Sequence, residues 1–206
     1  MKKLIILTGC SGHLGSAMLN ELLNYYYVIG ISRSAKDIEI KNKLKDRFIP
    51  YNCDFSLENT DKVILKIKTI IKDKDLTLKG LVNNAIFNMP SSPLSIEKEI
   101  ASNSIEGLFS YHVRLSINLA PLFLSPASII NVSSMYGKVA PDPSIYVENS
   151  QMNSLLYGSF KAALIQSTKY LSGIFSESNI RVNSVSYGPF PSEKVINDNP
   201  EFIKKL

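Results

Sequence analysis

The side chains best suited to move a proton in this chain are Tyr157 and Lys161. Of the ten tyrosines, only Tyr157 has a lysine four residues later. The apolar periodicity of residues 155–175 predicts a long helix, and this spacing places both side chains on one face of it. A phenol has an ordinary pKa of about 10 and needs a nearby positive charge to exchange protons at neutral pH. A lysine ammonium about 4–5 Å away supplies roughly 4 kcal/mol at an effective dielectric of about 20.

A glycine-spaced turn at residues 8–15 is the second element that could carry chemistry. It follows an apolar run at 4–7, which predicts a strand, and precedes apolar residues at helical spacing. Glycines at such a turn let the backbone approach a pyrophosphate, and the helix N-terminus faces the phosphate charge. We predict dinucleotide binding, with a purely structural turn as the alternative. The residues assigned to this site are Gly9, Ser11, Gly12, His13, Leu14 and Gly15.

The end of the second predicted strand bears on which dinucleotide is bound. Sites for NAD usually carry Asp or Glu there, whereas this chain has Ser32 and Arg33. A hydroxyl and a guanidinium can bind a 2′-phosphate through charge-assisted hydrogen bonds, so we predict a preference for NADP(H) over NAD(H). Asp54, after the third strand, is expected near the adenine. The alternative is that Arg33 stacks on the adenine or points to solvent.

Strands and helices alternate along the whole chain. Strands are predicted at 4–7, 27–31, 48–51, 80–83, 128–132 and 180–185, and helices after the first strand and at 57–74, 97–119 and 155–175. A short helix is expected in the lysine-rich segment between the second and third strands. This alternation predicts an α/β fold with a doubly wound parallel sheet, formed by residues 1–206 as a single domain. Ligands are then expected at the carboxyl ends of the strands.

Composition argues against several other classes of protein, among them nucleic-acid-binding, membrane, disulfide-rich and metal-binding proteins. The net charge of +5 comes from lysines interleaved with acidic residues, which is typical of a solvated surface rather than of a nucleic-acid site. No run of eighteen apolar residues and no signal peptide is present, so we expect a cytoplasmic protein without a membrane segment. Cys10 and Cys53 lie far apart, and no histidine cluster occurs. We therefore expect neither a disulfide framework nor a metal site.

Further motifs follow the later predicted strands. Asn83, Asn84 and Ala85 follow the fourth strand, Asn131-Val132-Ser133-Ser134 ends the fifth, and Ile180-Arg181-Val182-Asn183 leads into Tyr187-Gly188-Pro189. With the glycine turn and the Tyr157/Lys161 pair, this order resembles the short-chain dehydrogenase/reductase superfamily of Rossmann-fold, NAD(P)-dependent oxidoreductases. The resemblance covers essentially the whole chain.

The resemblance implies a role for each matching residue. Ser134, Tyr157 and Lys161 would be catalytic, with Ser134 donating a hydrogen bond to the reacting oxygen as its charge develops. Lys161 would also hold the nicotinamide ribose hydroxyls. Further cofactor contacts are implied for Asn83, Asn84, Ala85, Tyr157, Gly188, Pro189, Phe190 and Ser192.

Departures from the family pattern keep other functions open. His13 and Ile86 replace usual glycines, and Ser104 aligns with the family's catalytic Asn while Asn103 is one residue away. The glycine spacing itself resembles the branch of nucleotide-sugar epimerases and dehydratases. The alternatives are therefore a sugar epimerase or dehydratase that retains its nicotinamide, and a non-catalytic NADP(H)-binding regulatory subunit.

Two segments near the C-terminal half bear on substrate and assembly. The long loop between Ser134 and Tyr157 is rich in polar and aromatic residues, which suits a polar, sugar-like small molecule. Similar insertions occur in short-chain reductases of flagellin-glycosylation and nonulosonic acid loci. By resemblance the protein is a homo-oligomer, a dimer or tetramer, and lacks the usual seventh strand. Residues 180–185 would then be an exposed apolar edge. Either the chain is a truncated product, or residues 190–206 form a substrate lid without the support of that strand.

Overall fold

One parallel sheet of six strands forms the centre of the molecule, in the order β3-β2-β1-β4-β5-β6. The computed structural model describes residues 1–56, 60–87, 89–90, 92–146, 152–191 and 193–205. The strands are β1 (Lys2–Thr8), β2 (Tyr27–Ser32), β3 (Phe48–Asn52), β4 (Leu76–Asn83), β5 (Phe123–Ser134) and β6 (Ile180–Tyr187). The direction of winding reverses between β1 and β4, which opens a crevice at the carboxyl ends of the strands. The predicted doubly wound α/β fold is confirmed.

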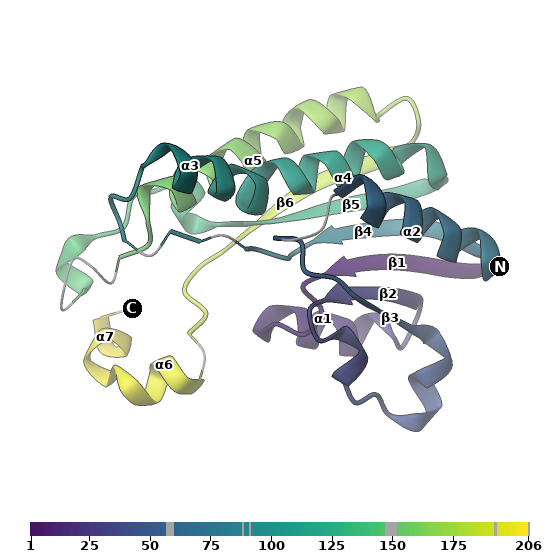
Figure 1. The fold of residues 1–206 in the computed structure, drawn as a ribbon, viewed down its shortest axis with the longest axis horizontal. Helices are drawn as coiled ribbons and strands as arrows, with labels where there is room; N and C mark the ends of the chain where they lie inside the picture. The colour runs from purple at the N-terminus through teal and green to yellow at the C-terminus, as the bar shows by residue number, and fades with distance from the viewer. Residues whose placement is uncertain (57–59, 88, 91, 147–151, 192, 206) are drawn as a thin grey trace.

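Helices cover both faces of this sheet (Figure 1). On one face α4 lies between α2 and α5 and contacts both, while α1 packs on the other face over β1 and β2. The longer helices are α1 (His13–Leu22), α2 (Thr60–Asp73), α3 (Lys98–Ile105), α4 (Tyr111–Leu119) and α5 (Leu155–Ile174), and the C-terminal ones are α6 (Glu193–Asp198) and α7 (Pro200–Lys205). The lysine-rich segment after β2 forms two short 3-10 helices, at Ala35–Asp37 and Asn42–Arg47, where a short helix was expected.

The central strand β1 is buried over the five consecutive residues 4–8. A parallel sheet that is covered on both faces needs an unbroken apolar run, because alternate side chains enter opposite layers. Leu4 and Ile6 pack in the cluster that includes α2, α4 and α5, whereas Leu7 packs with Leu19 of α1. This burial on both sides holds the end of β1 in place, and the glycine turn follows directly from that end.

The long helix predicted at 97–119 contains an interruption. It begins as α3, widens into a π turn at Glu106–Ser110 and continues as α4. A Cβ atom at Gly107 would lie 2.0 Å from the carbonyl oxygen of Phe87, so only glycine allows the turn to approach the loop after β4 so closely. Single π turns often occur near functional sites, and this one packs beside the crevice.

The last strand, β6, is the edge of the described sheet, and α6 and α7 stand apart from the sheet, off the carboxyl ends of its strands (Figure 1). The expectation that residues 180–185 expose an apolar edge is largely wrong. Ile180 and Val182 are buried, whereas Arg181 between them is exposed. Because side chains alternate along a strand, the apolar residues fall on the face that α5 covers. Val185 alone among the apolar residues of this stretch is exposed.

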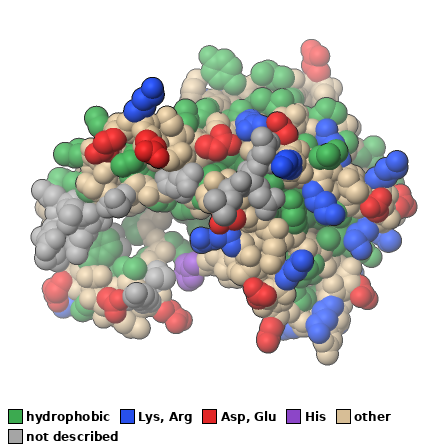
Figure 2. Space-filling model, in the orientation of Figure 1, with side chains coloured by type: hydrophobic (Ala, Val, Ile, Leu, Met, Phe, Trp, Pro, Cys, Tyr) green, Lys and Arg blue, Asp and Glu red, His purple; other side chains and the backbone are tan. Residues whose placement is uncertain are grey.

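Charges of both signs are mixed on the surface. Figure 2 shows Lys and Arg interspersed with Asp and Glu over the visible face. Within the described ranges, no helix is both long and apolar enough to cross a membrane. Cys10 and Cys53 are buried free thiols.

Two residues of α2 that lie two positions apart test which face of the helix is buried. Ile67 is fully buried, whereas Leu65 is 66% exposed. We expect Ile67→Ala to lower the free energy of unfolding by about 2–5 kcal/mol, because it removes packed methyl groups and leaves a cavity. Leu65→Ala should change it by less than about 0.5 kcal/mol. Equilibrium urea denaturation of both variants checks this, and equal losses would contradict the orientation of α2.

Candidate active site

The glycine turn is tight because it leaves no room for side chains at two positions. Gly9 adopts a φ of +69°, which is in the left-handed region. A Cβ atom at Gly15 would lie 1.9 Å from the carbonyl oxygen of Gly9. The amide N–H of Gly12 donates to the same oxygen at 3.1 Å, so the chain doubles back before α1 begins at His13. The N-terminus of α1 is thereby brought to the carboxyl end of β1.

The loop after β4 is fastened to this turn. The Thr8 hydroxyl accepts hydrogen bonds from the backbone N–H groups of Asn84 (2.9 Å) and Ala85 (3.0 Å). The Asn84 side chain donates in return to the carbonyl oxygens of Thr8 (3.0 Å) and Gly9 (3.2 Å). These four bonds join the ends of β1 and β4, so the two sides of the crevice have a fixed separation.

Asn83 lies beneath the crevice instead of on its wall. It is fully buried, and its amide donates to the Ser116 hydroxyl (3.0 Å) and to the Asn131 carbonyl oxygen (2.8 Å). The Asn131 amide in turn donates to the Thr168 hydroxyl of α5 (2.9 Å). Asn83 therefore does not line the cleft where a cofactor contact was expected, because its donors join β4 to α4 and β5, and Asn131 extends this network to α5.

A second buried group supports the loop after β4. His112 of α4 is fully buried, and its Nε2 lies 2.9 Å from the carbonyl oxygen of Ala85. Burial, together with the nearby charge of Lys161, lowers the pKa of His112 to about 3. The ring is therefore neutral, and its hydrogen sits on Nε2 if it donates to this carbonyl. Nothing in the sequence motifs singled out this residue.

Lys161 is a buried lysine at the centre of the site. Its side chain is 2% exposed, and its Nζ donates to the carbonyl oxygen of Val132 at 2.8 Å. Burial lowers the pKa of Lys161 to about 8, so the ammonium is still mostly charged at neutral pH. The Nζ atom lies 5.8 Å from the centre of the Tyr157 ring. The predicted pairing of these two side chains along one helix face is present in the structure.

Ser134 ends β5, and its O–H donates to no acceptor in the described part of the chain. Its oxygen accepts the backbone N–H of Tyr136 at 3.2 Å, at the start of the 3-10 turn Met135–Gly137. That turn lies against α5, where a Cβ atom at Gly158 would be 2.9 Å from the Tyr136 carbonyl oxygen. The close contact brings Ser134 to the same cleft as Tyr157 at the start of α5.

One cleft of about 890 Å³ joins these parts at the carboxyl end of the sheet. Every expected site residue in the described part of the chain lines it except Asn83, and Ser192 lies outside the described residues. Arg33 and Asp54 line it together. Hydrogen bonds from Ser56, and then the charge of Arg33, lower the pKa of Asp54. The cleft thus runs past the groups expected at the adenine, the pyrophosphate and the reacting carbon.

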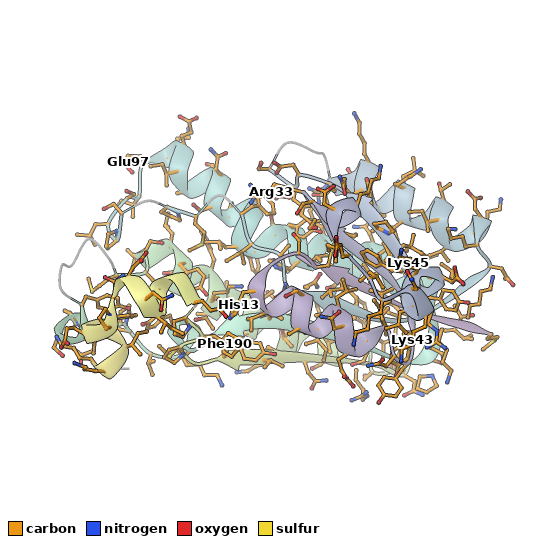
Figure 3. All side chains as sticks on the ribbon, turned by 90° about the horizontal axis from the view of Figure 1, so that it is seen from below. His13, Arg33, Lys43, Lys45, Glu97 and Phe190 are labelled. Atoms are coloured by element: carbon orange, nitrogen blue, oxygen red, sulfur yellow. The ribbon has the colours of Figure 1, made fainter. Side chains whose placement is uncertain are left out.

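Two rings that line the cleft, those of His13 and Phe190, contact each other. The rings of His13 and Phe190 lie 5.0 Å apart between centroids, and Figure 3 shows them side by side. His13 starts α1, and Phe190 follows β6 on the way to α6. This contact links the glycine turn to the C-terminal segment.

The sequence did not decide whether Ser104 or Asn103 takes the position of the family's catalytic Asn, and it did not predict all residues that line the cleft. Ser104 is fully buried, whereas Asn103 is exposed, so the inward position belongs to Ser104. Phe87, Met89 and Phe202 line the cleft without having been assigned to it. They come from the loop after β4 and from α7, and the sequence holds no pattern that would bring these segments together.

Residues 3–201 match the family described as short chain dehydrogenase. An NADH-dependent L-xylulose reductase of Ambrosiozyma monospora is 27% identical over 230 residues, which cover 98% of this chain and 78% of that protein.

Solved structures of similar fold carry either nicotinamide dinucleotide. A short chain dehydrogenase of Leptospira borgpetersenii with bound NAD+ is 24% identical, with a TM-score of 0.81 over 99% of this chain and 76% of that one. ElxO with NADP bound is 25% identical, with a TM-score of 0.77 over 97% of this chain and 80% of that one.

Burial of Lys161 makes stability depend on pH. Between about pH 8 and the ordinary lysine value of 10.5, the unfolded chain binds a proton that the folded protein has lost. The free energy of unfolding therefore rises with pH in this window, and below it the penalty for burying the charge is fully present. Relative to Lys161→Met, we expect wild-type stability to rise by roughly 3 kcal/mol across the window.

Urea denaturation from pH 7.5 to 10.5 measures this difference. Lys169→Met, on the exposed side of the same helix, is the matched control and should run parallel to wild type. A difference between wild type and Lys161→Met that does not change with pH would contradict the buried ammonium.

Proposed function

The chain belongs to the short-chain dehydrogenase family, and from that premise we propose that it is an NADP(H)-dependent oxidoreductase acting on a carbonyl or alcohol of a polar, sugar-like molecule. The observation that carries the proposal is the cleft itself. Ser134, Tyr157 and Lys161 line it together with the glycine turn at residues 9–15. A binding cradle and a proton-transfer group therefore share one cavity.

The residues present fit a dinucleotide. The turn has no room for a Cβ atom at Gly15, so bare backbone faces the cleft at the N-terminus of α1. Such a cradle suits a pyrophosphate. Ser32 and Arg33 at the end of β2 would hold a 2′-phosphate, and the remaining N–H groups of Lys161 would hold ribose hydroxyls. When bound, the nicotinamide supplies or accepts the hydride.

The protein's own residues would handle the proton. In reduction, the Tyr157 phenol gives its proton to the substrate oxygen, and in oxidation it takes the proton back. The free O–H of Ser134 donates to the same oxygen and stabilises the charge that develops on it. The Lys161 ammonium stabilises the phenolate that forms during the transfer. Burial strengthens this effect because little water screens the charge.

A sugar-like substrate is supported by Tyr136, Tyr146 and Asn153, which line the cleft, and by the similarity to an L-xylulose reductase. A homo-oligomeric state and a cytoplasmic location stay predictions from the sequence.

Removing the proton donor tests the catalytic assignment. Tyr157→Phe keeps the ring but deletes the hydroxyl, so we expect turnover to fall by about 100-fold or more. Cofactor affinity and the melting temperature should change little. Turnover is followed as NADPH absorbance with L-xylulose as the first probe. Tyr170→Phe, an exposed tyrosine of the same helix, is the control. Full activity of Tyr157→Phe would remove this residue from the mechanism.

A second substitution tests the choice of dinucleotide. Arg33→Gln removes the charge that would face the 2′-phosphate, so we expect NADPH to bind roughly 10-fold or more weakly. NADH affinity should change by less than about twofold, since NADH lacks this phosphate. Fluorescence titration measures both, with the exposed Arg181→Gln as control. Tighter binding of NADH than of NADPH by the wild type would refute the preference.

The same assays separate the alternatives. The glycine spacing at 9, 12 and 15 motivates an epimerase or dehydratase, which would convert a sugar without net change in the cofactor. The substitution of Ser104 for the family's Asn motivates a regulatory subunit, which would bind the cofactor without turnover. Steady NADPH consumption would exclude both.

A further inference from the structure

We propose that the hydrogen-bonded phenols of Tyr136 and Tyr146 form a recognition element for a substrate hydroxyl that lies away from the reacting carbon. This inference rests on the proposed function, because it assigns a substrate class to the same cleft. The two phenol oxygens lie 2.7 Å apart, and both side chains line the cleft that holds Ser134 and Tyr157.

The hydrogen-bond inventory of the pair leaves one donor for a ligand. Each phenol has one hydrogen and two lone pairs, and their mutual bond uses only one of the two hydrogens. Within the described residues, neither phenol oxygen has another hydrogen-bond partner. The phenol that accepts in this bond therefore has its own O–H free, and both oxygens keep lone pairs. A substrate hydroxyl, which can donate and accept, satisfies both needs.

Tyr136 is suited to recognition and not to acid–base chemistry. Burial, followed by the hydrogen bond to Tyr146, raises the pKa of Tyr136 well above that of an ordinary phenol. Its O–H therefore stays protonated over the whole physiological range. Its backbone N–H is bonded to the oxygen of Ser134, so Tyr136 has a fixed place relative to the residue expected at the reacting oxygen.

The C-terminal helix α7 also contacts the segment that carries Tyr146. Its ring lies 5.4 Å from that of Phe202, and the Lys205 Nζ donates to the carbonyl oxygen of Ser144 at 3.1 Å. Figure 1 shows α7 apart from the sheet, so these contacts join it to the loop after β5. The pair is thus preorganised, which reduces the entropy lost when a ligand is bound.

The chemistry of the pair favours polyhydroxy compounds over plain ketones. The phenols offer a donor and acceptors, while the Phe202 ring beside them can pack against C–H groups. A ketone without further hydroxyls would cover the free O–H and leave it without a partner. Sites built around such a bond discriminate strongly against analogues that lack the matching hydroxyl.

Two probes of equal carbon skeleton test the inference. L-xylulose and pentan-2-one are both five-carbon chains with the carbonyl at the second carbon, and only the first carries hydroxyls. We expect Tyr136→Phe and Tyr146→Phe each to lower kcat/KM for L-xylulose by about tenfold or more, with turnover of pentan-2-one and NADPH affinity unchanged. Tyr170→Phe is the control. An equal fall for both probes, or no fall for either, would overturn the inference.

A binding measurement separates this inference from the proposed function. Xylitol binding to the NADP+-loaded protein is followed by ligand-observed NMR, which requires no turnover. If the wild type reduces neither L-xylulose nor pentan-2-one, the proposed reduction is refuted for these two substrates. Xylitol binding that is lost in both Phe variants but kept in Tyr170→Phe would still support the recognition element. No binding by wild type, or equal binding by every variant, would overturn it.

Discussion

The ammonium group of Lys161 has to stay charged where water barely reaches, and much of the surrounding architecture follows from this requirement. A buried ammonium needs hydrogen-bond acceptors, and the end of β5 supplies the carbonyl oxygen of Val132. Ser134, two residues further along β5, lines the same cleft. The Ser133 hydroxyl donates to the carbonyl oxygen of Lys161 itself at 2.9 Å, and a Cβ atom at Gly137 would lie 2.8 Å from the Lys161 carbonyl carbon. The strand β5, the turn Met135–Gly137 and the helix α5 therefore pack closely around the Lys161 ammonium.

Buried amides extend this rigidity to the other half of the cleft. The bonds from Asn83 to Asn131, and from Asn131 to Thr168, connect β4 and β5 to the helix that carries the lysine. Asn84 connects the end of β4 to Thr8 at the glycine turn. Every step uses a side-chain amide or hydroxyl whose alternative would be an unsatisfied buried group. The glycine turn and the Tyr157/Lys161 pair consequently keep a fixed distance, as the proposed hydride transfer at a bound nicotinamide would require.

Local patterns were enough to predict the fold and most of the cleft. Unbroken apolar runs predict buried parallel strands, and the residues at their carboxyl ends must share an edge, which places Gly9 and Ser134 together. Tyr157 is assigned from its helical spacing to Lys161 and from the family resemblance, and it lines the same cleft. Features that depend on distant packing could not be predicted. The π turn at Glu106–Ser110 arises from the approach of Gly107 to Phe87, and the inward orientation of Asn83 follows from strand register. The contact of Tyr146 with α7 joins segments whose sequences share no periodicity.

The most direct test of the account is a crystal structure of the protein with NADP+ bound. The account predicts the pyrophosphate on the turn at residues 9–15, the 2′-phosphate beside Arg33, and the nicotinamide ribose on Lys161 next to Tyr157. It also predicts that the Tyr136–Tyr146 pair remains open toward the nicotinamide side of the cleft. A dinucleotide bound outside this cleft, or one whose nicotinamide lies at the Arg33 end, would contradict the central claim that the cradle and the buried lysine serve one reaction.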